Sequence, residues 1–256
     1  MLGLRIISAL VAGPLVLVAG YWGRWPLALL VALSAGLAWW EMRVILRCHE
    51  IELPPWSLGW TLLLLFAAPA GPVPLDQALA AIVIVSLAET VLRCGRNMYA
   101  WGWQVATGLY TGFLLRYLLL IRGLLGPGPL FLVLAVTWGA DTAAYFIGLR
   151  FGRHRLAPTI SPGKSVEGAA AGVVGAMLSA LLVARLFTLS PPVALAAGAA
   201  AGVVGPLGDL AESALKRWAG VKDSSRLIPG HGGVLDRLDS LLFVAPTVYY
   251  ILLWLG

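Results

Sequence analysis

The sequence is short of charge. Only 12% of its 256 residues are Asp, Glu, Lys or Arg, whereas 60% are hydrophobic and the mean hydropathy is +0.88. A soluble domain carries about 25% charged residues. The composition therefore excludes an ordinary soluble domain and indicates an integral membrane protein.

Cysteine is almost absent as well. Cys48 and Cys94 are the two in the chain, and they lie far apart in the sequence. Two such thiols make neither a disulfide framework nor a zinc site. The run Cys48-His49-Glu50 does not change this, because adjacent residues do not share a helix face. We expect two free thiols.

Long apolar runs, by contrast, fill the chain. About 20 apolar residues cross the hydrocarbon core of a bilayer, and nine such spans fit the sequence. An all-α fold is predicted, a polytopic membrane bundle of about nine transmembrane helices that leaves only loops between them. The predicted spans are approximately 4–21, 26–46, 56–71, 75–92, 100–121, 128–149, 167–187, 191–212 and 239–255.

The basic residues are distributed unevenly between the two faces of this bundle. Four of the 18 Lys and Arg residues, namely Arg24, Arg116, Arg122 and Arg185, fall on one face, and the remaining fourteen fall on the face that holds the N-terminus. Basic loops stay in the cytoplasm. We therefore predict a cytoplasmic N-terminus and chemistry that faces the cytoplasm. As the location we expect the bacterial inner membrane, with this chain as an integral protein of it.

The two halves of the chain differ in where polar residues occur. Residues 1–130 are hydrophobic, and we expect them to form a scaffold that offers a surface for a second copy. Residues 131–256 bring polar side chains into the spans and into the cytoplasmic loops. We expect the catalytic region there.

The stretch 138–152 places an acid inside a span. Trp138, Asp141, Tyr145 and Gly148 recur at helical spacing and share one face. A buried aspartate costs about 2.5 to 3.5 kcal/mol on insertion, and such residues usually face a bundle interior or a wet cavity. Asp141 is therefore a candidate for substrate binding, with a bond to a neighbouring helix as the alternative.

The stretch 158–168 has the composition of a phosphate-binding turn. Gly163-Lys164-Ser165 resembles the end of a nucleotide-binding P-loop, but Pro158 stands where the leading glycine of that motif belongs. We reject a P-loop. Lys164 and Ser165 at a helix start still suit an anion, and simple helix capping is the alternative.

Residues 208–240 bring two acidic helix faces together. Asp209, Glu212, Ser213 and Lys216 share a face where one span ends, and Asp236, Asp239 and Ser240 share a face where the last span begins. Carboxylate oxygens suit Mg²⁺, and the intervening basic residues suit a polyphosphate. The pattern predicts metal-assisted chemistry on a phosphate-bearing substrate, against the alternative of charges that pair with one another.

The same residues resemble a known family, the phosphatidate cytidylyltransferases or CDP-diacylglycerol synthases. The resemblance lies in SALKRWAGVKDSSRLIPGHGGVLDRLD, from Ser213 to Asp239, and in three shorter motifs that precede it in the family's order. One position departs from the family, because Gly163 stands where a lysine is expected. The shorter motifs are Trp138, Asp141, Ala144 and Tyr145; Ser161, Pro162, Lys164, Glu167 and Gly168; and Gly208, Asp209, Glu212 and Ser213.

The resemblance implies a reaction and its cofactor. CTP and phosphatidic acid would give CDP-diacylglycerol and pyrophosphate, with Mg²⁺ required and a second cation left open. It also implies a homodimer in contact with membrane lipid, and no nucleic-acid partner is expected. Asp209 and Asp236 would hold the metal ion, and Asp239, Lys222 and Asp223 would complete the catalytic group. The expected substrate-binding residues are Asp141, Lys164, Ser165, Glu212, Ser213, Lys216, Arg217, His231, Gly232, Gly233 and Arg237.

Two rival functions remain at this stage. A CTP-dependent lipid kinase of polyprenol or phytol would share such spans but release CDP. A transporter would use Asp141 and Asp209 as an ion or proton relay. It would leave the segment around His231 without a role.

Overall fold

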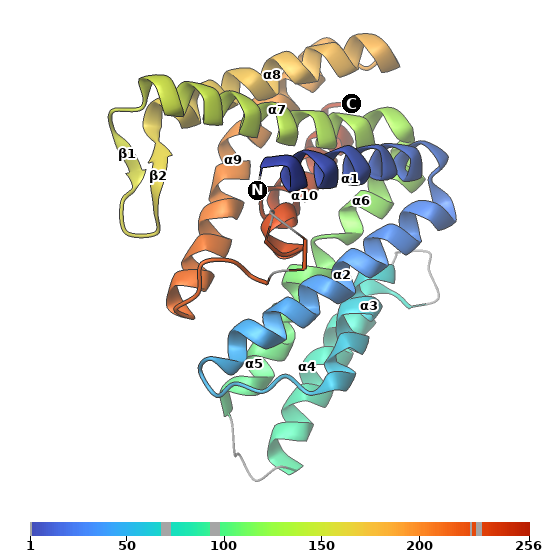
Figure 1. Ribbon diagram of the computed structural model, residues 1–256. Coiled ribbons are helices and arrows are strands. Elements are labelled where there is room, and N and C mark those ends of the chain that lie inside the picture. The colour runs from blue at the N-terminus through green and yellow to red at the C-terminus, as the bar shows by residue number, and fades with distance from the viewer. Residues whose placement is uncertain (1, 68–72, 93–97, 226, 229–231) are drawn as a thin grey trace.

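The chain folds into a bundle of helices (Figure 1). The computed structural model describes residues 2–67, 73–92, 98–225, 227–228 and 232–256. The elements in chain order are α1 (Leu2–Trp22), α2 (Arg24–Arg47), η1 (Pro55–Ser57), α3 (Leu58–Phe66), α4 (Leu75–Leu92), α5 (Met98–Thr107), η2 (Gly108–Phe113), α6 (Arg116–Leu120), η3 (Ile121–Leu125), α7 (Pro127–Phe151), β1 (Arg155–Ala157), β2 (Ser161–Ser165), α8 (Val166–Phe187), α9 (Pro191–Trp218) and α10 (Leu235–Leu255).

The predicted all-α membrane architecture is confirmed. Within the described residues, seven helices are long and apolar enough to cross a membrane, and two shorter apolar helices cover 10–22 and 55–66. These nine stretches lie where the nine spans were predicted. The number that cross the bilayer and the side of the N-terminus stay predictions.

The four C-terminal helices pack through small residues. α7 and α8 lie side by side along one edge of the molecule, and α9 contacts both α8 and α10 (Figure 1). A Cβ on Gly202 of α9 would stand 2.5 Å from the Cα of Val173 of α8, and a Cβ on Gly175 would stand 2.5 Å from the Cβ of Ala143 of α7. Glycine therefore permits the close approach of these helices.

A small antiparallel hairpin joins α7 to α8, and the sequence analysis did not predict it. Strand β1 pairs with β2 in the register Arg155↔Ser165 and Ala157↔Ser161. The Nε of Arg217, near the end of α9, donates a 3.3 Å hydrogen bond to the Ile160 carbonyl in the turn of the hairpin. The hairpin is thereby held beside the last part of α9 (Figure 1).

The N-terminal half contributes a second packing unit beside the four C-terminal helices. Leu64, Ala67, Ala78 and Ile82 form a buried cluster between α3 and α4, against which residues of α5 and η2 pack. α2 runs from α1 along this unit toward the end of α9 (Figure 1). The C-terminal end of α2 is tied to that helix, because His49 stacks on Trp218 with ring centroids 3.8 Å apart.

Candidate active site

Three carboxylates from α9 and α10 converge. Asp209 and Glu212 lie one turn apart on α9, and Asp239 comes from the first two turns of α10. Each offers a ligand atom within 4.8 Å of the others. Glu212 is 1% exposed, and its Oε1 has no hydrogen-bond donor among the described residues. Three acids this close repel one another unless a cation balances them.

A lysine joins this acidic triad to a fourth carboxylate. The Nζ of Lys216 lies 2.5 Å from Glu212 Oε2 and 2.5 Å from Asp236 Oδ1. Both Lys216 and Glu212 are buried. The other oxygen of Asp236 accepts hydrogen bonds from the backbone N–H groups of Ser224 and Gly233 and from the Ser224 hydroxyl, at 2.8 to 3.0 Å. Asp236 is therefore neutralised and held by the protein itself.

A second lysine reaches the triad from the hairpin. Lys164 Nζ lies 2.5 Å from Asp209 Oδ2, and the Ser213 hydroxyl donates to Asp209 Oδ1 at 3.2 Å. Ser165 follows directly and caps α8, since its hydroxyl accepts from the Gly168 N–H at 3.1 Å. The predicted helix start is confirmed. The cap fixes the residue before it, and so places Lys164 over α9.

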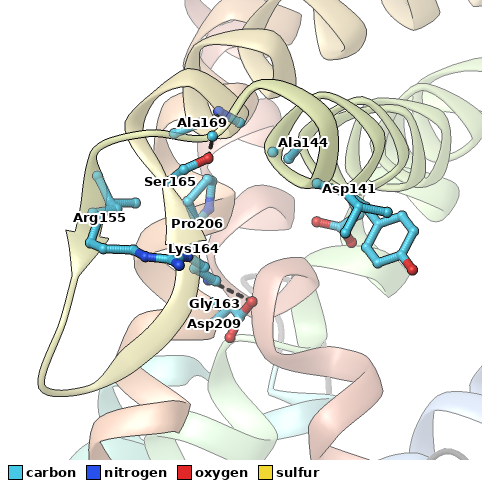
Figure 2. Close-up of a pocket in the computed structure, with 15 residues that line it drawn as sticks. Asp141, Ala144, Arg155, Gly163, Lys164, Ser165, Ala169, Pro206 and Asp209 are labelled. Carbon is cyan, nitrogen blue, oxygen red and sulfur yellow. Dashed lines mark hydrogen bonds and ion pairs between the residues drawn. The ribbon is translucent and has the colours of Figure 1, made fainter.

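A cavity of about 660 Å³ opens beside this lysine (Figure 2). Ligand sites usually measure about 300 to 1,000 Å³. Its walls come from α7, the hairpin, the start of α8 and the middle of α9. Figure 2 shows Lys164 reaching from β2 to Asp209, with Asp141 on the α7 side. Asp209 belongs both to the cavity wall and to the triad, so the cavity adjoins the acidic triad.

Charged and apolar side chains line the cavity together. Asp141, Arg155, Lys164 and Asp209 line it together with Tyr145 and Leu149. The last two are 65% and 75% exposed on the outer face of α7. Within a membrane, such a face contacts lipid. An amphiphilic ligand with a charged head would fit this distribution.

The residues of the triad fit a divalent cation. Hard carboxylate oxygens are the ligands that Mg²⁺ and Ca²⁺ take in proteins, and Oε1 of Glu212 has no hydrogen-bond donor in the part of the chain that the structure describes. Asp209, Glu212 and Asp239 bring such oxygens from two helices to one place. Asp209 and Asp236 are the metal ligands predicted from the sequence. Asp236 lies outside the triad, and its Oδ1 contacts Lys216, which in turn contacts Glu212 of the triad.

Four further predicted residues lie at the end of α9, in the loop that follows it and at the start of α10, namely Arg217, Lys222, Asp223 and Arg237. The Arg217 guanidinium donates to the carbonyls of Ile160 and Val221, so it supports the hairpin and the loop. Lys222, Asp223 and Arg237 are exposed at the ends of α9 and α10. His231 lies outside the described residues.

Gly232 and Gly233 lie against carboxylates. Gly232 has φ +81, and a Cβ there would stand 2.6 Å from Asp236 Oδ2. A Cβ on Gly233 would overlap the Ser224 hydroxyl and Glu41 Oε1. Side chains at both positions would displace the two acids.

Glu41 of α2 belongs to the site, although the sequence analysis did not single it out. Its carboxylate is fully buried and accepts hydrogen bonds from the Val234 and Leu235 N–H groups at the start of α10. A signal for it existed, because Glu41 is an acid within the predicted span 26–46, and an acid inside a span marks a candidate site. Arg155 was missed for another reason, since its position on a strand appears only in the fold.

Comparison with known proteins identifies a family whose members resemble this chain. A model of the cytidylyltransferase family matches residues 3–255. A phosphatidate cytidylyltransferase from Bacillus subtilis is 35% identical over 263 residues, which cover 97% of this chain and 96% of that protein. One from Brucella suis is 36% identical over 260 residues, with 96% and 91% covered. One from Thermotoga maritima is 42% identical over 150 residues, or 56% of each chain.

Proposed function

The chain belongs to the cytidylyltransferase family, and on that premise we propose that it is a phosphatidate cytidylyltransferase. It transfers CMP from CTP to phosphatidic acid and forms CDP-diacylglycerol and pyrophosphate. The observation that carries the proposal is the acidic triad of Asp209, Glu212 and Asp239, flanked by Lys164 and Lys216. Cations on both sides of a metal-binding cluster suit two polyphosphate-bearing substrates.

The reaction needs little covalent help from the protein. A phosphomonoester is mostly dianionic at neutral pH, so an oxygen of the lipid phosphate attacks the α-phosphorus of CTP without a protein base. The bond from the α-phosphorus to the bridging oxygen breaks, and pyrophosphate leaves with the electron pair. The protein has to bring two polyanions together and balance the charge of the leaving group.

Lysine and arginine side chains of the site are proposed to bind the phosphates of the two substrates. Lys164 and Arg155 line the cavity together with Tyr145 and Leu149. In the proposal the two cations bind the lipid phosphate, and the acyl chains lie along Tyr145 and Leu149. Lys216, Arg217, Lys222 and Arg237 lie at the ends of α9 and α10, on the side from which CTP arrives. Asp141, Ser165 and Ser213 are proposed to orient substrate groups where the cavity meets the acidic triad.

Mg²⁺ is the proposed cofactor. Asp209, Glu212 and Asp239 would hold the ion, and Asp236 is proposed as a further ligand. Lys216, which contacts Asp236 Oδ1, would bind a substrate phosphate. When bound, the ion neutralises charge on the phosphates during transfer. Asp223, Gly232 and Gly233 are proposed to lie near the CTP phosphates, and His231 is proposed as a substrate-binding residue.

The products distinguish this function from its rivals. Purified protein given CTP, phosphatidic acid and Mg²⁺ should release pyrophosphate in amounts equal to the CDP-diacylglycerol formed. A lipid kinase would release CDP. A transporter that uses Asp141 and Asp209 would move ions without consuming CTP, and either result would exclude the cytidylyltransferase proposal.

The site is proposed to face the cytoplasm of a bacterium, because the basic residues concentrate at that end of the helices. CTP is made in the cytoplasm, so this orientation gives the nucleotide direct access. A homodimer is proposed from the family resemblance, with the helices of residues 1–130 as its interface.

A further inference from the structure

Glu41 accepts four hydrogen bonds, two from the loop after α9 and two from the start of α10. Its Oε1 accepts from the Ser225 hydroxyl at 2.6 Å and from the Val234 N–H at 2.8 Å. Its Oε2 accepts from the Ser224 hydroxyl at 3.1 Å and from the Leu235 N–H at 2.7 Å. The side chain is 0% exposed. These donors come from residues more than 180 positions further along the chain.

Glu41 caps a helix to which it does not belong. Val234 is the N-cap residue of α10, and it offers no side-chain hydrogen bond to the helix. The first N–H groups of a helix need acceptors, and a negative charge at that end is favourable. A carboxylate from α2 supplies both.

The site accepts a carboxylate and rejects its amide. Each oxygen of Glu41 faces one hydroxyl and one backbone N–H. A glutamine side chain would present its NH₂ group to a backbone N–H, which is always a donor. The space around the carboxylate is restricted as well, because a Cβ on Gly233 would overlap Glu41 Oε1.

The Glu41 contacts continue directly into the catalytic cluster. Ser224 donates its hydroxyl toward both Glu41 Oε2 and Asp236 Oδ2. Asp236 in turn holds Lys216, which holds Glu212. A single row of contacts therefore leads from α2 to the acidic triad.

We propose that Glu41 is a positioning residue for the transfer reaction, holding the start of α10 and the Ser224 loop so that Asp236 and Lys216 face the triad. The proposal rests on the proposed function for the reaction that is positioned. It gives the N-terminal half of the chain a direct part in the site.

Glu41→Gln tests the proposal, with Glu52→Gln as its matched control. Glu52 is an exposed acid in the loop after α2, so its variant loses the same charge without touching the Ser224 loop. Misplacing a reacting group by about 1 Å can lower the rate by about 10²-fold. We expect kcat of Glu41→Gln to fall between about tenfold and 10²-fold, with the KM values for CTP and phosphatidic acid little changed.

A double-mutant cycle locates the coupling. Ser224→Ala removes the hydroxyl that Glu41 and Asp236 share. If Glu41 acts on Asp236 through the Ser224 hydroxyl, Glu41→Gln combined with Ser224→Ala should lower kcat hardly more than the stronger single variant. Additive losses would contradict positioning through Ser224.

Hydrogen exchange supplies a readout independent of catalysis. In Glu41→Gln, the amides of Val234 and Leu235 should exchange faster, whereas those of α7 and α8 should keep their rates. Unchanged kcat per folded molecule, or faster exchange throughout the protein, would reduce Glu41 to a structural anchor and overturn the proposal. Should Glu41→Gln fail to fold, Ser225→Ala removes one of the four donors and serves in the same two measurements.

The two proposals fail separately. If the unaltered protein transfers no CMP to phosphatidic acid, the proposed function is wrong. The exchange rates of Val234 and Leu235 would still show whether Glu41 fixes this loop. If CMP transfer occurs and Glu41→Gln keeps it, the positioning role alone is lost.

Discussion

At the residue scale, the site is a balance between buried acids and two lysines. Asp209, Glu212 and Asp239 converge within 4.8 Å. Lys164 and Lys216 each contact one member of this triad. The triad keeps more negative charge than the lysines neutralise, because Lys216 is shared with Asp236. This remaining charge is the physical reason to expect a divalent cation.

The acids of the triad should therefore be needed for catalysis more than for folding. We expect Asp209→Asn and Asp239→Asn each to lower CMP transfer at least about 100-fold, since even partners of metal ligands are worth about 10- to 100-fold. Both variants should stay folded, because removing one of three neighbouring acids relieves repulsion. Activity titrated with Mg²⁺ and thermal unfolding in detergent measure the two effects.

Asp76→Asn is a suitable control for these variants, because Asp76 lies in the first turn of α4, away from the site. Near-normal turnover by Asp209→Asn or Asp239→Asn at saturating Mg²⁺ would remove that residue from the proposed metal site. The same titration of Asp236→Asn decides whether the second predicted ligand contributes.

At the element scale, the spacing of α8 and α9 sets the contact between Lys164 and Asp209. Lys164 is fixed to the start of α8 through the cap at Ser165, and Asp209 lies on α9. Gly202, two turns before Asp209, allows α9 to approach α8 at Val173. The glycines of this interface therefore serve the site as well as the packing.

Gly202→Ala should separate the two helices. The new methyl group would have to displace the backbone at Val173, and overpacking of this kind costs about 1 to 3 kcal/mol. We expect a lower thermal midpoint and a higher KM for phosphatidic acid. Gly102→Ala is the control, since a Cβ at Gly102 of α5 meets nothing within 4 Å. Equal stability of the two variants would contradict the role given to Gly202.

At the scale of the whole molecule, much of the fold follows from the sequence, whereas the long-range contacts do not. The apolar runs predict the helices because lipid allows few other backbone structures. The hairpin at 155–165 escapes prediction, because Pro158, Pro162 and Gly163 interrupt any strand pattern. Helical spacing places Lys216 and Asp236 on polar faces, but it cannot tell which charges pair. The acid at Glu41 stands out within its span, but its hydrogen-bond partners cannot be predicted, since they lie in the other half of the chain.

The predicted topology is testable with an impermeant thiol reagent. In a chain with Cys48→Ser and Cys94→Ser, a cysteine at Gly163 in the hairpin should react only from the cytoplasmic side. A cysteine at Thr188, between α8 and α9, should react only from the outer side. Both positions are exposed. Labelling of both from one side would contradict the proposed membrane crossing of α8.

The most direct test of the proposed reaction follows each phosphate of CTP. Membranes that contain the protein, Mg²⁺ and phosphatidic acid would receive CTP labelled at the α-phosphate, and parallel samples would receive CTP labelled at the γ-phosphate. We expect the α-label in lipid, the γ-label in pyrophosphate, and neither transfer with Asp209→Asn. Appearance of the γ-label in lipid, or of no label there, would contradict cytidylyl transfer by this protein.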